Sequence, residues 1–244
     1  MLSALALAAV VLASPAASCV ATEGGFDWGF KESFRAYLSG SIANGEWSTV
    51  GGIGYETPVF TSESLAGSVA LAPLDGELAV GGALRFTGHE GILDTTVSNL
   101  RVALDGQRLQ LIVDVRGTTQ EFVEVDTADV LFATGDLTAA EWTAGEDGLL
   151  IAGIPLTLTA EGAEAFGTYP EGEALDPLDL RLAATPACAD EAIAARAAGG
   201  GMLVPLLIVG LVVLAVAASV LVHLRLRAAK RRGGGAEPEV PQPQ

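Results

Sequence analysis

The chain has 244 residues, with 13 Lys and Arg against 30 Asp and Glu, a formal net charge of -17, and a hydrophobic content of 50%. A chain this acidic lacks the clustered cations that nucleic-acid phosphates require, and its aliphatic content excludes a wholly disordered protein. Two cysteines are too few for a disulfide scaffold or a cysteine-based zinc site.

The chain begins with an apolar run at 2–13, followed by small residues up to Ser18. This pattern is typical of a secretory signal peptide, although the basic residues that usually precede the apolar run are missing. We therefore expect residues 1–18 to be a signal and residues 19–190 to form one domain outside the cytoplasm.

A helix is predicted at 28–38, because apolar residues recur there at helical spacing and Asp27 precedes them as a candidate N-cap. Ser33 and Tyr37 are four residues apart, so they are neighbours on the surface of this helix. A second, short helix is predicted at 160–166.

The rest of the domain reads as strands and turns. A hairpin is predicted from 97–104 and 108–116, which are joined by Asp105-Gly106-Gln107. Further β-rich runs lie at 68–71, 77–87, 121–133, 149–158 and 178–183. Many short strands predict a mostly β fold, either a sandwich or an open barrel-like sheet, with an N-terminal helix and a short second helix.

Cys19 and Cys188 bracket the predicted domain. In an exported protein, a disulfide that joins its two ends is the first interpretation. The alternative is a lipidated Cys19, but Ala16 rather than Leu stands three residues before it. Both interpretations place the domain outside the cytoplasm.

Residues 203–224 contain no charged side chain. As a helix they are long enough to cross a hydrocarbon core of about 30 Å, so a single transmembrane helix is predicted. Residues 191–202 are expected to be a linker. The tail at 225–244 holds five cations close to the membrane, which places it in the cytoplasm and makes the protein a single-pass cell-membrane protein.

The position of the charge follows from this division. The tail holds 5 of the 13 cations and 2 of the 30 acids, which leaves 8 cations and 28 acids in residues 1–224, a net charge of -20. The negative charge therefore belongs to the domain outside the cytoplasm, and the apolar excess belongs largely to the signal and the anchor.

The predicted domain contains a single histidine, His89. One histidine cannot form a catalytic zinc site with two or three His ligands, and the chain has neither an HExxH nor a GxSxG motif. We therefore expect a protein that is not an enzyme.

Four segments together resemble the HtaA-domain haem-binding proteins of actinobacteria. They are WGFKESFRAYL within 26–38, residues 42–45, GHEGILD within 86–94, and residues 166–178. The likeness covers nearly all of the predicted domain, and one such domain with a C-terminal anchor is similar to the shorter HtaB-type members.

The resemblance implies a binding site for ferric haem b. Tyr37 matches the tyrosine that ligates the haem iron, His89 matches the histidine that hydrogen-bonds this tyrosine, and Ser33 and Tyr169 match residues that line the haem pocket. A phenolate is a hard oxygen donor suited to ferric iron. The family likeness further implies haem capture from haemoproteins or sibling carriers and transfer towards a membrane haem importer.

Taken one by one, the same residues have simpler interpretations. Tyr37 on the apolar face of a helix is ordinarily a core residue, and His89 between glycines is ordinarily a turn residue. The alternative function is therefore a cell-surface adhesion or structural β-sandwich module without haem. That alternative predicts that Tyr37 and His89 lie far apart.

Overall fold

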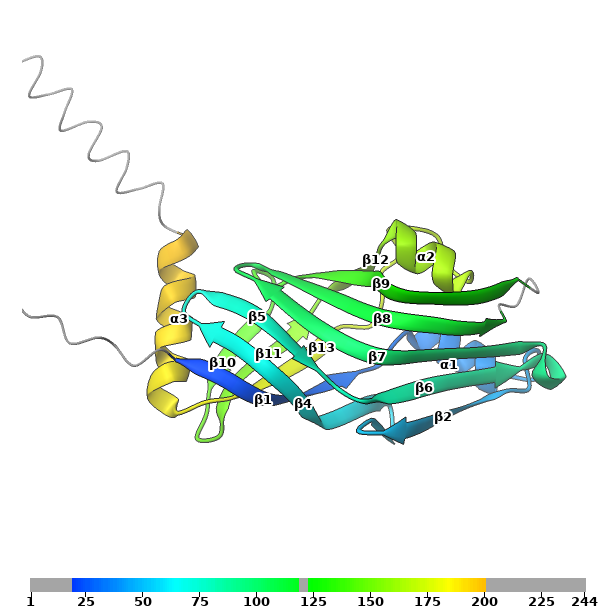
Figure 1. The fold of residues 1–244 in the computed structure, drawn as a ribbon, viewed down its shortest axis with the longest axis horizontal. Coiled ribbons are helices and arrows are strands. Elements are labelled where there is room, and N and C mark those ends of the chain that lie inside the picture. Colours follow the sequence, from blue (N-terminus) through cyan, green and yellow to red (C-terminus); the bar gives the residue numbers. More distant parts are fainter. Residues whose placement is uncertain (1–18, 119–122, 201–244) are drawn as a thin grey trace, which may run out of the picture. The chain divides into compact units, whose positions relative to one another are not determined.

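The computed structural model describes residues 19–118 and 123–200, most of which form one antiparallel sheet (Figure 1). The predicted signal at 1–18, transmembrane helix at 203–224 and cytoplasmic tail at 225–244 lie outside the described residues. Within the described part, no helix combines the length and the apolar character needed to cross a membrane.

The elements of the domain are named as in Figure 1. The strands are β1 (Val20–Trp28), β2 (Glu46–Gly51), β3 (Gly54–Glu56), β4 (Val59–Leu71), β5 (Leu74–Ala79), β6 (Gly82–Gly88), β7 (Leu93–Asp105), β8 (Arg108–Thr118), β9 (Glu124–Asp136), β10 (Glu141–Ala144), β11 (Gly148–Ile154), β12 (Leu156–Leu158) and β13 (Leu178–Ala183). The helices are α1 (Glu32–Ser39), α2 (Ala160–Phe166), α3 (Pro186–Gly200) and the single 3₁₀ turn η1 (His89–Gly91).

The strands form a single curled sheet, so the predicted mostly β fold is confirmed as an open half-barrel and the sandwich interpretation is wrong. The main path of the sheet runs β10-β11-β13-β1-β4-β5-β7-β8-β9-β12. The long strand β7 pairs with β6 along its first half and with β5 along its second half. Long strands that change partners along their length let one sheet curl over its own core, and no second sheet is needed.

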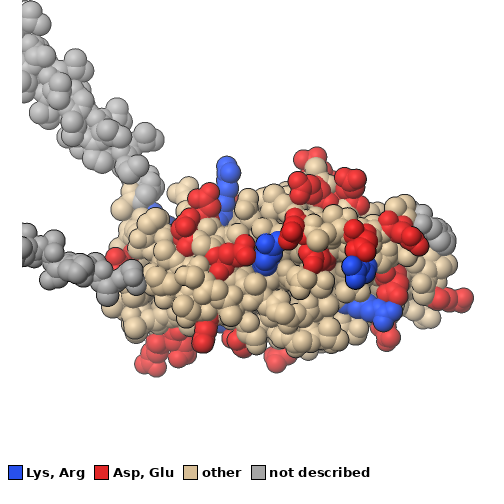
Figure 2. Space-filling model, in the orientation of Figure 1, with Lys and Arg blue, Asp and Glu red and all other residues tan. Residues whose placement is uncertain are grey.

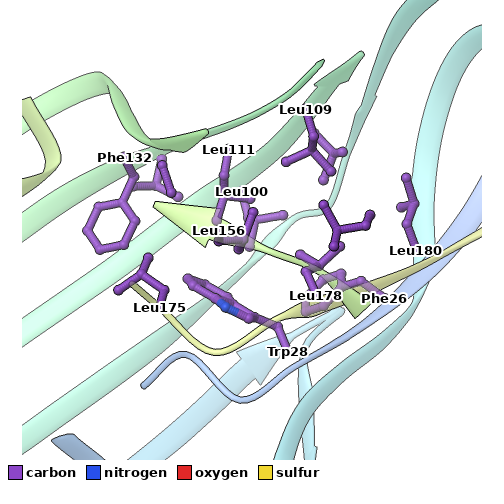
Figure 3. Packing of buried hydrophobic residues seen from close by; sticks show 14 of the residues in the cluster. Phe26, Trp28, Leu100, Leu109, Leu111, Phe132, Leu156, Leu175, Leu178 and Leu180 are labelled. Atoms are coloured by element: carbon purple, nitrogen blue, oxygen red, sulfur yellow. The ribbon is translucent and has the colours of Figure 1, made fainter. Parts of the chain in front are cut away.

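Buried side chains alternate along the long strands and line the inner face of the sheet. In β8, Leu109, Leu111, Val113 and Val115 are buried. Leu109 and Leu111 lie with Phe26, Trp28 and Phe132 in one core cluster (Figure 3). This alternation fixes the register of each strand, because a shift of one residue would expose the apolar set.

The predicted hairpin of β7 and β8 is confirmed, with Asp105 paired to Arg108 and Gly106 in the left-handed region at φ 59°. The early strands β1, β2 and β3 lie outside the β-rich runs found in the sequence. Their segments are rich in Gly, Ser and Thr. The partners of β1 and β2 lie far along the chain, in β4, β13 and β6, whereas β3 forms a tight hairpin with β4.

The first helix is shorter than predicted. Strand β1 continues to Trp28, Phe30 adopts a left-handed backbone at φ 63°, and α1 begins only at Glu32. The prediction that Asp27 is the N-cap is wrong, because Asp27 lies in β1 and pairs with Arg181 of β13.

The predicted second helix is confirmed as α2. The Thr159 side chain accepts a hydrogen bond from the backbone N–H of Gly162 and caps its start, and Gly167 ends it at φ 69°.

A disulfide joins Cys19 to Cys188, with their Cα atoms 5.4 Å apart. The bond connects the residue before β1 to α3 and confirms the predicted link between the ends of the domain. Because the Cys19 sulfur is part of this bond, the lipidation alternative does not fit. Helix α3 covers most of the segment that was expected to be a linker.

Candidate functional site

Helix α1 carries two of the four predicted site residues at the end of the domain opposite α3 (Figure 1). Phe34 and Leu38 are buried and fix one face of the helix against the sheet. Tyr37, on the flank of this face, is only partly buried. The helix therefore holds a phenol close to the surface on a rigid support.

Tyr37 and His89, which are 52 residues apart in sequence, are in direct contact. The Tyr37 hydroxyl forms a short hydrogen bond with Nε2 of His89. The backbone of His89 lies in the left-handed region at φ 51°, and its N–H donates to the carbonyl of Ala43 at 2.7 Å. A non-glycine residue held in this conformation is uncommon and is found disproportionately at functional sites.

The loop between α1 and β2 fixes the distance between Tyr37 and His89. The N–H of Gly45 donates to the carbonyl of Leu38 at 2.8 Å, so the loop is tied to the end of α1. A Cβ on Gly45 would lie 2.0 Å from the carbonyl oxygen of Thr87 in β6. Only glycine therefore allows the loop to pass this close to the strand that leads to His89.

Ser33 and Tyr169, the other two predicted residues, form a second pair. Their hydroxyls lie 3.1 Å apart, within hydrogen-bond distance. Phe34 stands between the two pairs, with its ring centre 6.4 Å from that of Tyr37 and 6.5 Å from that of Tyr169. The structure therefore brings all four predicted residues together at one site.

A cluster of six buried aromatic side chains lies behind this site. Phe30 is at its centre, with its ring centre 4.9 Å from both Trp28 and Phe86 and 5.2 Å from Phe166. Phe34 and Phe132 complete the cluster. Tilted and edge-on arrangements are the preferred contacts between aromatic rings, so the cluster gives the site a closely packed apolar base.

Apolar side chains are also exposed beside the histidine. Ile42 precedes Ala43 and is 77% exposed, and Ile92, whose N–H donates to the His89 carbonyl, is 40% exposed. The sequence reasoning gave these two isoleucines no role, although both fall inside the segments that carry the resemblance.

The cations nearest to Tyr37 in sequence are both paired. Lys31 Nζ lies 2.5 Å from Glu173 and 5.4 Å from the centre of the Tyr169 ring. Arg35 lies 3.0 Å from Asp176. Glu173 and Asp176 lie in the segment 166–178, but nothing in the linear sequence connects them to cations 142 and 141 residues away.

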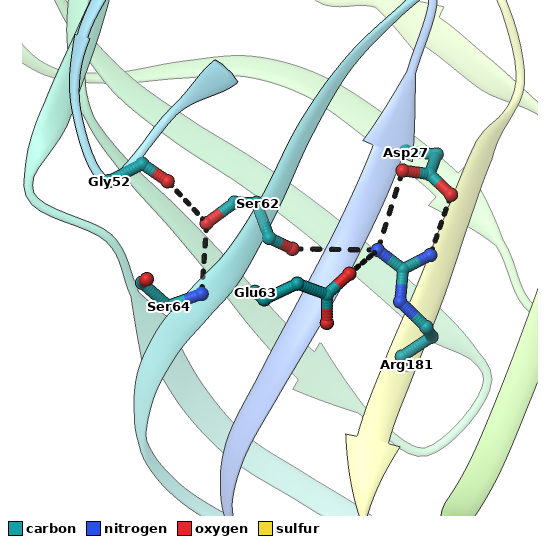
Figure 4. Close-up of polar contacts among 6 residues, drawn as sticks. All are labelled: Asp27, Gly52, Ser62, Glu63, Ser64 and Arg181. Atoms are coloured by element: carbon teal, nitrogen blue, oxygen red, sulfur yellow. Dashed lines mark hydrogen bonds and ion pairs between the residues drawn. The ribbon is translucent and has the colours of Figure 1, made fainter. Parts of the chain in front are cut away.

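A second polar cluster lies away from Tyr37, along β1, β4 and β13. Arg181 binds Asp27 and Glu63, each at 2.6 Å (Figure 4). Two open cavities of about 570 Å³ each flank this arginine. Among the described residues, no group of three or more His, Cys, Asp and Glu side chains has the geometry to hold a metal ion. None of the four predicted site residues belongs to this cluster or lines these two cavities.

The geometry of the site suits one kind of chemistry. A phenol oxygen contacts an imidazole nitrogen at a half-exposed position, with apolar side chains beside it. An ionised phenol is a hard anionic donor, and an imidazole can accept or return its proton. The site is thus able to offer one oxygen to a ferric ion within an apolar, flat-faced ligand.

Comparisons with known proteins identify the family to which the chain belongs. The HtaA family model, described as Htaa, matches residues 23–181. The chain is 30% identical to the C-terminal domain of HtaA from Corynebacterium glutamicum, with a TM-score of 0.59 over 68% of this chain and 99% of that one. No curated protein sequence matches.

Two further solved structures are similar. The N-terminal domain of the same HtaA is 27% identical, with a TM-score of 0.52 over 68% of this chain and 98% of that one. The haem-binding protein HtaB from Corynebacterium glutamicum is 28% identical, with a TM-score of 0.50 over 67% of this chain and 94% of that one. Since the family match extends from β1 to β13 and includes all four site residues, the chain belongs to the HtaA family.

Proposed function

We propose that this protein binds ferric haem b, with Tyr37 as the axial ligand of the iron and His89 as the hydrogen-bond partner of that ligand. The contact between the Tyr37 hydroxyl and Nε2 of His89 carries the proposal. The similarity to HtaB, a haem-binding protein, supports the same ligand.

The side chains around Tyr37 fit haem in three respects. A free phenol has a pKa of about 10, so it needs help to ionise at neutral pH. The ferric ion of haem supplies a positive charge that favours the phenolate, and His89 is placed to take up or share the proton. Exposed Ile42 and Ile92 offer apolar surface to a porphyrin, and the hydroxyls of Ser33 and Tyr169 line the same site.

Haem carriage outside the cytoplasm completes the proposal. A signal at 1–18 and an anchor at 203–224 would hold the domain at the outer surface of the cell membrane. Helix α1, which carries Tyr37, lies at the end of the domain opposite α3, the last helix that the structure describes (Figure 1). Haem would come from haemoproteins or sibling carriers and would pass on to a membrane haem importer.

Titration of the purified protein with ferric haem tests the proposal. We expect a shifted Soret band for the wild-type protein and its loss in Tyr37→Phe, which removes the oxygen and keeps the ring that packs on Phe34. Tyr55→Phe is the matched control, because Tyr55 packs on Trp47 and Phe60 and is given no role in binding. Equal Soret shifts in the wild type and Tyr37→Phe would contradict the ligand assignment.

The alternative adhesion or structural module predicts that Tyr37 and His89 are far apart. Their contact, and the second contact between Ser33 and Tyr169, favour the haem site over that alternative. A wild-type protein that leaves the haem spectrum unchanged would reverse this preference.

A further inference from the structure

Asp176 makes four hydrogen bonds to the segment 28–35, which ends β1 and begins α1. Its carboxylate accepts the backbone N–H of Glu32 through Oδ1 at 2.9 Å and the guanidinium of Arg35 through Oδ2 at 3.0 Å. Its own backbone N–H donates to the carbonyl of Phe30 at 3.0 Å, and its carbonyl accepts from Nε1 of Trp28 at 3.1 Å. One residue thus holds the whole turn that leads from β1 into α1.

Helix α1 has no N-terminal cap from its own sequence. Lys31 occupies the N-cap position and makes no side-chain capping bond. A helix of eight residues is marginal by itself, so its stability depends on tertiary contacts. The carboxylate of Asp176 does the work of a missing N-cap, and its negative charge is favourable at the positive end of the helix dipole.

The approach of Asp176 to the helix is close and largely shielded from water. A Cβ on Gly29 would lie 2.2 Å from Oδ2 of Asp176, so this carboxylate occupies space that only glycine leaves open. The side chains of Arg35 and Asp176 are 11% and 22% exposed. A charged hydrogen bond is stronger in such a setting than on an open surface.

Arg35 depends on this carboxylate. Among the described residues, Asp176 is the only hydrogen-bond acceptor of its guanidinium, and its buried Nε has no partner. Arg35 lies one helical turn after Lys31, which is bound in the same way to Glu173 and to the carbonyl of Ala174. The segment 173–176 therefore binds the first turns of α1 from one side.

This segment is itself fixed to the sheet. The carbonyl of Glu173 accepts the N–H of Leu158 at 2.9 Å, and the N–H of Leu175 donates to the carbonyl of Leu156 at 3.0 Å. Leu156 and Leu158 belong to β12, which pairs with β9. Asp176 therefore links the start of α1 to the sheet.

We propose that Asp176 is a positioning residue for the iron ligand. We assign it no contact with haem itself. By capping α1 and binding Arg35 it fixes the helix that carries Ser33 and Tyr37, and so sets the Tyr37 hydroxyl against His89. The expected effect on haem binding rests on the proposed function. The claim that Asp176 fixes α1 rests only on the contacts of that helix.

Two measurements on Asp176→Asn test the two parts separately. The first is backbone amide hydrogen exchange in α1 of the haem-free protein, where we expect about tenfold faster exchange from loss of a charged hydrogen bond. The second is ferric haem affinity, which we expect to fall about tenfold, with an altered ferric spectrum. Asp27→Asn is the matched control, because Asp27 forms a similar pair with Arg181 away from α1 (Figure 4).

Arg35→Gln breaks the same pair from the helix side and covers the case in which Asp176→Asn fails to fold. If the two residues act through one contact, the loss of affinity in the double variant is smaller than the product of the single losses. Unchanged exchange in α1, or faster exchange with unchanged haem affinity and spectrum, would overturn the positioning role. A wild-type protein without haem affinity overturns the proposed function instead, and the exchange data still decide whether Asp176 holds α1.

Discussion

His89 is constrained by its backbone as well as by its contact with Tyr37. Its left-handed conformation, the similar one at Glu90 and the hydrogen bond to Ala43 together fix the backbone from which the imidazole projects. Such a conformation costs about 1 to 3 kcal/mol and persists only where the surroundings enforce it. The cost is consistent with a side chain whose orientation matters more than local stability.

Substitution of this histidine tests its role in the proposed site. In His89→Ala the Tyr37 hydroxyl loses its partner, so we expect ferric haem affinity to fall by about 10- to 100-fold, as for other residues that support a metal ligand. The optical spectrum of the ferric complex should also change. An unchanged affinity and spectrum would remove His89 from the site.

A different residue pair makes the stability of the domain depend on pH. Burial by itself raises the pKa of Asp27. Hydrogen bonds from Arg181 and Thr61 lower the pKa by more than burial raises it, so the pKa lies below the ordinary value of 3.8. A carboxylate with a depressed folded-state pKa stabilises the fold above the unfolded-state pKa. This contribution is lost as the pH falls through the folded-state value.

We therefore expect Asp27→Asn to be less stable than the wild type at pH 7, by roughly 1 kcal/mol for a half-buried ion pair. The difference should shrink below about pH 4. Urea unfolding at pH 7 and at pH 3 measures it. Asp147→Asn, at an exposed position, is the control and should be neutral. A constant difference across this range would contradict the ionic origin of the effect.

At the scale of elements, α1 is held between two segments that are remote in sequence. The loop at 40–45 ties its end to β6 and η1, while the segment 173–176 ties its start to β12. The buried ring of Phe34 packs between them on the aromatic cluster. The position of the phenol is thus a property of four elements and not of the helix alone.

Gly45→Ala tests the loop side of this arrangement. The added methyl group would lie 2.0 Å from the Thr87 carbonyl oxygen, so the loop must move. We expect a loss of about 1 to 3 kcal/mol in the free energy of unfolding and a weaker haem complex. Gly81→Ala is the matched control, because no atom lies within 4 Å of its added Cβ, and it should bind haem normally.

At the scale of the whole domain, Figure 2 shows many more acidic than basic side chains on the visible face. Several of the cations are bound to acids of the same chain, as in the pairs of Arg85 with Asp94 and Arg116 with Asp126. The excess negative charge thus lies on side chains of the solvated outer surface. In our proposal, an apolar ligand is retained by the local site and by one iron–oxygen bond, and not by the field of the domain.

The disulfide secures this domain at the end opposite the site. It closes a loop with a sequence separation of 169, so its removal enlarges the unfolded ensemble considerably. We expect Cys19→Ser with Cys188→Ser to lower the free energy of unfolding by about 2 to 5 kcal/mol. The haem spectrum should not change, since the bond lies far from Tyr37. A changed spectrum in the folded double variant would show that the two ends are coupled.

The sequence by itself predicted the mostly β class of fold, the β7–β8 hairpin and helix α2, which the structure confirms. It offered the disulfide as the first of two interpretations of Cys19, and the roles of the four site residues stay a prediction. The confirmed elements depend on local patterns of alternation and turn residues, whereas the four site residues come from short motifs that carry the family resemblance. Hydrophobic periodicity also located α1 but placed its start too early, because Phe30 completes the apolar pattern from a left-handed turn outside the helix.

Only the tertiary structure showed how the sheet curls and which residue caps α1. The sandwich and the half-barrel bury the same alternating side chains, and they differ in pairings between strands far apart in the chain. Likewise, Asp27 stands where a local N-cap is expected, but its carboxylate binds Arg181 in the neighbouring strand, and Asp176 from the other end of the domain caps the helix. Ion pairs and hydrogen bonds form between groups that are close in space, and the order of residues in the sequence does not give these distances.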